Sequence, residues 1–77
     1  MPTATVTLAT PDAQSVYGAI APEAGRDIPR TRTSASFADG RMVLRVEATD
    51  LSALRAALNS YLRWIMVAEE VNRLAGA

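Results

Sequence analysis

Residues 50–74, DLSALRAALNSYLRWIMVAEEVNRL, are the most informative stretch of this chain and predict one uninterrupted helix. On a helical wheel at ~100° per residue, the apolar side chains form two neighbouring stripes, and polar side chains fill only a narrow wedge. The first stripe consists of Leu51, Leu54, Leu58, Leu62 and Ile65. The second consists of Ala53, Ala57, Tyr61, Trp64, Ala68, Val71 and Ala75.

The two stripes end at different points along the helix. After Ile65, Glu69 and Asn72 take the place of the leucines, whereas the second stripe continues. A helix of this length spans about 37 Å, more than the ~30 Å diameter of a compact chain of this size. We therefore expect the leucines to cover the protein's own core, the second stripe to be left for a partner, and the helix to overhang its domain.

Before this helix, the sequence predicts a β-hairpin between residues 31–37 and 42–48. Asp39-Gly40 is a favoured two-residue turn, because both turn positions require positive φ. The turn predicts three pairs on one face: Phe37 with Met42, Ala35 with Leu44, and Thr33 with Val46. On the other face it predicts Ser36 with Val43, Ser34 with Arg45, and Arg32 with Glu47, the last a candidate ion pair. Turn chemistry and burial pattern thus agree on one register.

The first part of the chain predicts a strand and then a short helix. Residues 3–9 alternate between threonine and apolar side chains, as half-buried strands do. Thr10, Pro11 and Asp12 then supply an N-cap, a first-position proline and a first-turn acid, and the helix is expected to end near Ala21. Regular structure is expected to stop across 22–30, at Pro22, Gly25 and Pro29. Thr49-Asp50 is expected to cap the long helix.

This order of elements predicts the fold class. Strand, helix, strand, strand and helix make a two-layer α+β domain, in which a three-stranded antiparallel sheet carries both helices on one face. The first strand is expected beside the third. We expect residues 1–77 to form a single domain.

Composition favours assembly with other chains. Eight acidic residues balance eight arginines, and a net charge near zero suits neither a free monomer nor general attraction to nucleic acid or membranes. So small a chain buries little core, and it has no cysteine with which to form a disulfide. No apolar run reaches the ~18 residues of a membrane span, and the start lacks a signal pattern, so we expect a cytoplasmic protein.

The sequence also argues against an enzyme. Histidine and cysteine are both absent, which removes the usual neutral-pH general base, thiol catalysis and most zinc sites. The acids are scattered, and the isolated glycines form no phosphate-binding loop. We therefore expect no catalytic residue, no cofactor and no bound metal.

An RNA-binding module is the alternative function, because the order of elements resembles part of a KH domain. A KH domain grips RNA with a GXXG loop, whereas residues 24–27 read Ala-Gly-Arg-Asp. Arg26, Arg30 and Arg32 form a modest basic cluster that, with the Thr/Ser-rich face of the sheet, would serve a stand-alone module as RNA contacts. Alternatively, these three arginines are only solvated charges of a loop and bind nothing.

Residues 50–65, DLSALRAALNSYLRWI, closely resemble the signature of the small Pcc-type subunit of the KEOPS complex, the CTAG/Pcc family. Ala21-Pro22-Glu23, Ile28-Pro29-Arg30 and the order of elements add support. The resemblance implies a non-catalytic dimerisation and scaffold subunit. In this family a homodimer packs its helices against the N-terminal helices of a Kae-type catalytic subunit. That partner holds the metal and makes threonylcarbamoyladenosine in tRNA, so tRNA is met through the complex.

The resemblance also implies which residues bind the partner: Ala57, Tyr61, Trp64, Ala68 and Val71, joined by Ser15 and Ala19 of the first helix. Trp and Tyr are frequent interface anchors, although Tyr61 borders both stripes and fits the core equally well. The sheet would leave an edge strand open along residues 3–9, and pairing of this edge between protomers would close it.

Overall fold

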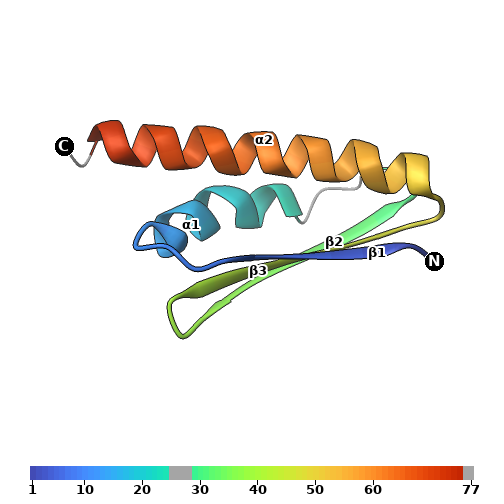
Figure 1. Ribbon diagram of the computed structural model, residues 1–77, viewed down its shortest axis with the longest axis horizontal. Coiled ribbons are helices and arrows are strands. Elements are labelled where there is room, and N and C mark those ends of the chain that lie inside the picture. Colours follow the sequence, from blue (N-terminus) through green and yellow to red (C-terminus); the bar gives the residue numbers. More distant parts are fainter. Residues whose placement is uncertain (25–28, 76–77) are drawn as a thin grey trace.

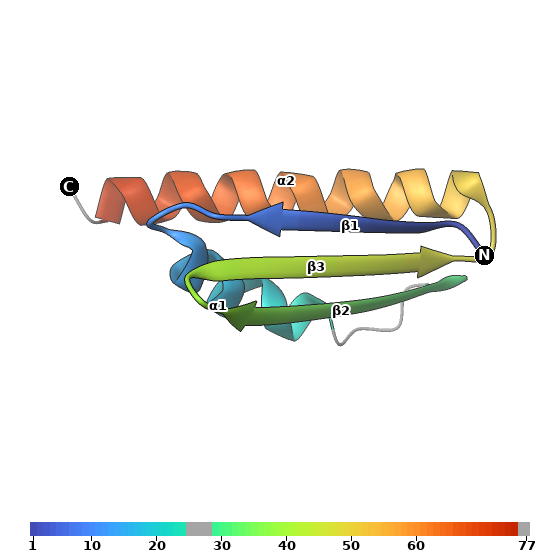
Figure 2. The ribbon, with the colours of Figure 1, turned by 60° about the horizontal axis from the view of Figure 1, so that its bottom comes forward.

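The computed structural model describes residues 1–24 and 29–75, and it confirms the predicted α+β fold (Figure 1). The elements are β1 (Thr3–Leu8), α1 (Ala13–Ala24), β2 (Thr31–Ala38), β3 (Arg41–Ala48) and α2 (Leu51–Ala75). The strands form an antiparallel sheet in the order β1-β3-β2, so β1 lies beside β3 as expected. Both helices cover the same face of the sheet, with α2 over the β1 side (Figure 2).

The hairpin has the predicted register. All six predicted pairs are present, from Phe37 opposite Met42 to Arg32 opposite Glu47. Asp39 and Gly40 have φ values of 54° and 74°, as this type of turn requires. The expected ion pair is different, however. Glu47 pairs with Arg45 of its own strand at 3.3 Å, because residues two apart on a strand point to the same face.

The core lies between the sheet and the two helices, and the central strand β3 and the helix α2 contribute equally to it. Its buried side chains are Val16 and Ile20 of α1, Met42, Leu44 and Val46 of β3, and Ala57, Tyr61 and Ile65 of α2. The alternation of β3 explains this arrangement, because every second residue points towards the helices. The predicted apolar face of the hairpin is therefore the inner face of the sheet.

Helix α1 begins and ends later than predicted. Its first residue is Ala13, and the carbonyl of Asp12 accepts the first helical bond, from the Val16 amide at 2.9 Å. At the other end the helix continues through Pro22 to Ala24, so the predicted break is wrong for residues 22–24. The last turn is held by burial of Ala24 and by a tertiary hydrogen bond to α2, which outweigh the missing proline N–H. Residues 25–28 lie outside the described part.

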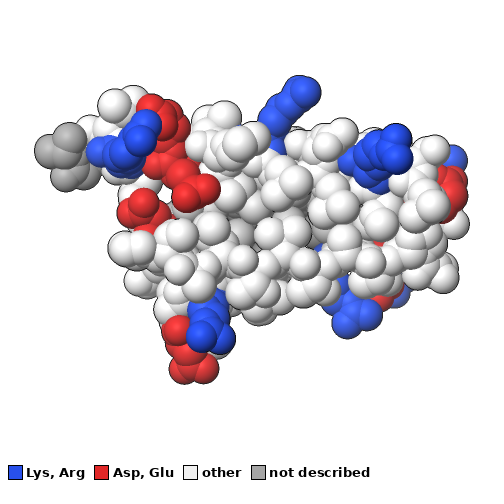
Figure 3. All heavy atoms as spheres, in the orientation of Figure 1, with Lys and Arg blue, Asp and Glu red and all other residues white. Residues whose placement is uncertain are grey.

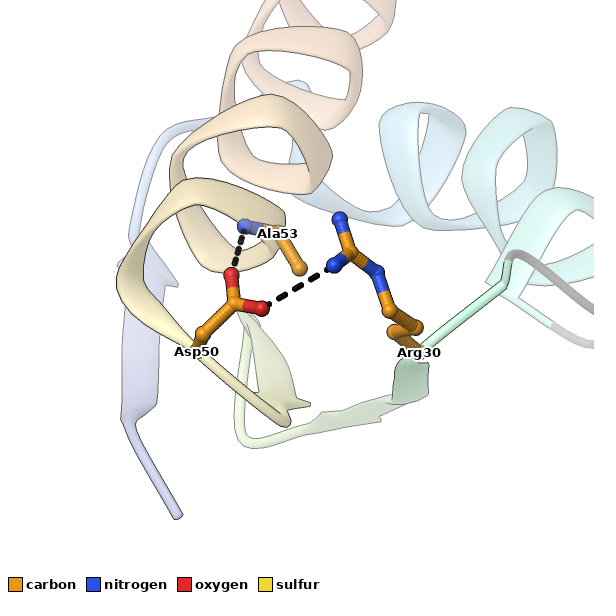
Figure 4. Close-up of polar contacts among 3 residues, drawn as sticks. All are labelled: Arg30, Asp50 and Ala53. Atoms are coloured by element: carbon orange, nitrogen blue, oxygen red, sulfur yellow. Dashed lines mark hydrogen bonds and ion pairs between the residues drawn. The ribbon is translucent and has the colours of Figure 1, made fainter.

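The start of α2 confirms the predicted cap. Asp50 Oδ1 accepts a hydrogen bond from the Ala53 amide at 2.8 Å, and Asp50 Oδ2 pairs with Arg30 Nη1 at 3.1 Å (Figure 4). The carbonyl of Arg30, whose φ is 64°, also accepts from the Thr49 amide at 3.0 Å. These contacts join the start of α2 to the start of β2.

The roll of α2 about its own axis differs from the prediction. Its buried residues are Ala53, Ala57, Tyr61 and Ile65. The predicted leucine stripe is divided: Leu51 is 71% exposed and Leu62 is 40% exposed, whereas Leu54 and Leu58 are half-buried against the core and Ile65 is buried in it. Alanines let α2 approach the sheet and α1 closely, and the larger Tyr61 fills the space between them. The leucines therefore lie at the margin of the core rather than at its centre.

Helix α2 extends beyond the rest of the fold, as its length predicted. The molecule measures 40 × 23 × 17 Å, and the last turn of α2 projects past α1 and the sheet (Figure 1). One polar contact holds this half of the helix, because Asn72 Nδ2 donates to Asp12 Oδ1 at 2.6 Å just before α1. The overhanging part of α2 therefore has little of its own fold beneath it.

Candidate functional site

A groove between α1 and the C-terminal half of α2 is the best-formed concave surface among the described residues. Its volume is about 630 Å³. It is lined by Ser15, Ala19, Ile20 and Glu23 of α1 and by Trp64, Val67, Ala68, Val71, Asn72 and Ala75 of α2. Most of these side chains are apolar, and several are small. We call this surface the interhelical groove.

Trp64 forms part of the groove wall and rests on Tyr61. The two rings meet edge to face, with centroids 5.1 Å apart and planes at 88°. Tyr61 is fully buried, and its hydroxyl donates to the carbonyl of Glu23 at 3.1 Å. Trp64 remains 37% exposed. The two aromatic residues therefore have different positions: Tyr61 belongs to the core, and Trp64 presents its indole to the groove.

The structure separates the five residues predicted to bind a partner. Trp64, Ala68 and Val71 line the groove, together with the expected Ser15 and Ala19. Ala57 and Tyr61 are instead buried in the chain's own core, where a ligand in the groove does not reach them. Partner contact itself remains a prediction for all of these positions.

Sequence reasoning missed four members of the groove: Ile20, Glu23, Val67 and Asn72. Val67 is 61% exposed and stands three residues after Trp64 and four before Val71, so helical spacing could have identified it. Ile20 and Glu23 line the groove because α1 packs on α2, and no local sequence pattern predicts that packing.

Of the arginines predicted as RNA contacts, Arg26 falls outside the described residues, and the other two lie away from the groove. Arg30 and Arg32 are both exposed and share a smaller depression of about 470 Å³ at the other end of the molecule. Its lining residues are Met1, Pro29, Arg30, Thr31, Arg32, Glu47 and Thr49. Arg30 is held there by Asp50.

A second apolar surface lies where α2 passes the edge strand β1. We call Leu51, Leu54, Leu58 and Leu62 the leucine row; the first and last are exposed and the middle two are half-buried. In the view of Figure 3, charged atoms lie around the rim of the molecule, including the α2 rim, whereas the centre of the visible face below α2 is uncharged. Because β1 is an edge strand, its outer backbone groups are available for pairing with another strand.

The groove offers binding surface rather than reactive chemistry. Glu23 is the one ionisable side chain in its lining, and Ser15 and Asn72 are the other polar ones. Across residues 1–24 and 29–75, no group of three His, Cys, Asp or Glu side chains is placed to hold a metal ion. Neither described helix has an apolar stretch long enough to cross a bilayer.

A small two-layer domain with an open groove, an edge strand and an exposed row of leucines is typical of a protein-binding module. Comparison with known proteins identifies its family. The family model described as "Transcription factor Pcc1" matches residues 2–73, so the chain belongs to the Pcc1 family.

A named relative resembles the chain over part of its length. The KEOPS complex subunit Pcc1 of Pyrococcus abyssi (strain GE5 / Orsay) is 50% identical over 46 residues. The matched segment covers 57% of this chain and 56% of the relative, so the chain matches just over half of the relative's length.

Proposed function

We propose that this chain is a non-catalytic subunit of a KEOPS complex, which dimerises and scaffolds the complex in the cytoplasm. In this role it supports threonylcarbamoyladenosine modification of tRNA by a Kae-type catalytic partner. Family membership and the name of the Pyrococcus relative support the assembly. The observation that carries the proposal is the interhelical groove, in which Trp64 and Val71 remain exposed.

The groove suits the N-terminal helices of the catalytic partner. Packed helix axes lie 8–10 Å apart, and small side chains at the contact allow the closer separations. Ala19, Ala68 and Ala75 supply such side chains on both walls. Trp64 projects from one wall, and a partly exposed Trp supported by a buried ring is a common interface anchor. A partner helix would cover the overhanging part of α2, which its own fold leaves open.

The leucine row and the outer edge of β1 form the proposed dimer contact. A two-fold axis beside β1 would pair the two edge strands antiparallel and bring the two leucine rows together. The contact would then combine backbone hydrogen bonds with apolar burial. It lies on the opposite side of α2 from the groove, so one protomer can bind its copy and the catalytic partner at once.

Co-purification with the catalytic subunit tests the proposal. A tagged catalytic subunit is expressed with wild-type chain, Trp64→Ala or Met66→Ala, and the retained chain is quantified. Met66 is a matched control, because it lies on the same helix, is 61% exposed and does not line the groove. Removal of an anchor that contributes about 2 kcal/mol weakens binding by more than tenfold. The Trp64→Ala chain should therefore not be retained by the tagged catalytic subunit. Equal retention of both variants would contradict the proposal.

A further inference from the structure

The face of the sheet that points away from the helices carries hydroxyl and arginine side chains. By strand register and alternation this open sheet face consists of Thr3, Thr5, Thr7, Arg32, Ser34, Ser36, Ala38, Arg41, Val43, Arg45 and Glu47. All of these are exposed except Val43 and Glu47, which are half-buried. Val43 and the small Ala38 are its apolar members. The composition is that of a polar surface on which five hydroxyl groups surround the charged residues.

The charge of this face differs from the charge of the whole chain. Three arginines stand against one glutamate, whereas the whole chain has zero formal charge. The remaining residues must then carry the compensating negative charge. The chain is therefore neutral as a whole but positively charged on this face. A positive face is the electrostatic requirement for binding a polyanion.

The arginines of the open sheet face are close enough to act together. Arg32 lies opposite Glu47 and Arg45 lies opposite Ser34, so the two arginines are diagonal neighbours on adjacent strands. Diagonal neighbours in a sheet are ~7–8 Å apart, a distance over which two long side chains can reach adjacent phosphates of one strand. The depression that contains Arg30 adjoins this pair at Arg32 and Glu47.

The position of the aromatic residues limits what the face can recognise. Tyr17 and Phe37 pack together on the helix side of the sheet, with centroids 5.9 Å apart, and Tyr61 and Trp64 belong to α2. These are all the aromatic residues of the chain. Bases therefore have no ring on which to stack, and binding must rely on phosphate and sugar contacts.

We propose that the open sheet face binds the phosphate–ribose backbone of RNA without reading its bases. The arginines pair with phosphates, and the Thr and Ser hydroxyls contact 2′-hydroxyl groups, which distinguish RNA from DNA. The choice of RNA rests on the proposed function, whereas the polyanion chemistry rests on the face itself. Arg32 and Arg45 are the principal contacts, and Glu47 opposes binding by occupying Arg45.

The salt dependence of RNA binding tests this proposal. Affinity of the full chain for an unmodified tRNA transcript is measured between 50 and 200 mM salt. Arg32→Gln with Arg45→Gln is compared with Arg55→Gln with Arg63→Gln, which removes equal charge from α2. Loss of two phosphate contacts lowers the magnitude of the slope of log K against log salt by about 1.6. The ratio of wild-type affinity to variant affinity should therefore fall roughly ninefold between 50 and 200 mM salt. Glu47→Gln should bind RNA more tightly than wild type.

The outcomes separate this proposal from the proposed function. Equal slopes in both double variants would contradict a contact at the open sheet face. A DNA oligonucleotide that binds as tightly as RNA of the same sequence would contradict the assignment to RNA. Each variant is also checked for folding by thermal melting and for co-purification with the catalytic subunit. If RNA binding is unaffected while co-purification still depends on Trp64, this inference is wrong and the proposed function stands.

Discussion

Tyr61→Phe removes a single oxygen atom and so tests whether α2 is rolled as described. The Tyr61 ring is fully buried, and its hydroxyl donates to the Glu23 carbonyl at 3.1 Å in the last turn of α1. An intramolecular hydrogen bond contributes about 0.5–1.5 kcal/mol to the free energy of unfolding. The partly buried Glu23 carbonyl also loses this donor, which adds to the cost. We expect the free energy of unfolding to fall by about 1–2 kcal/mol. For a domain of this size, that lowers Tm by roughly 5–15 °C.

Thermal unfolding followed by circular dichroism measures this effect. All samples need the same protein concentration, because a dimer melts at a temperature that depends on concentration. Tyr17→Phe is the matched control, since Tyr17 is half-buried and no hydrogen bond of its hydroxyl occurs in the part of the chain that the structure describes. Its Tm should change by far less. Equal Tm values for the two variants would refute the burial of the Tyr61 hydroxyl against α1.

Three further variants test the start of α2 and the proposed dimer. Asp50→Ala removes the cap of Ala53 and the pairing with Arg30, and it should cost about 1 kcal/mol of stability by chemical denaturation, whereas Asp50→Asn should retain most of it. No difference between these two variants would mean that the cap contributes nothing. Leu62→Arg places a charge in the leucine row and should shift sedimentation towards the monomer with little change in secondary structure; an unchanged dimer would exclude this surface.

Local signals in the sequence predicted most of the fold. The Asp39-Gly40 turn fixes the hairpin, and the alternation of the flanking strands selects the same register, so two independent features agree. The cap at Asp50 is equally local, because it involves residues three apart. Such features depend on neighbours in the chain and need no knowledge of tertiary packing.

The roll of α2 and the length of α1 depend on tertiary contacts, and the sequence-based predictions of both differ from the structure. A helical wheel shows which side chains are apolar but not which of two adjacent apolar stripes faces the core. Here Ala57 allows α2 to pack closely on the core, and the Tyr61 hydroxyl donates a hydrogen bond to the Glu23 carbonyl, 38 residues earlier in the chain. The same hydrogen bond helps α1 to continue past Pro22. The sequence-based set of partner residues on α2 therefore included two residues, Ala57 and Tyr61, that belong to the core.

The proposed function requires that the exposed indole of Trp64 becomes covered by the catalytic partner. Trp64 is the chain's one tryptophan, so incorporation of 5-fluorotryptophan gives a single ¹⁹F NMR signal that survives addition of an unlabelled partner. We expect a solvent-sensitive signal in the free chain, which shifts and loses its sensitivity to D₂O when the catalytic subunit binds. A signal that is already insensitive to solvent, or one that the bound partner leaves unchanged, would contradict it.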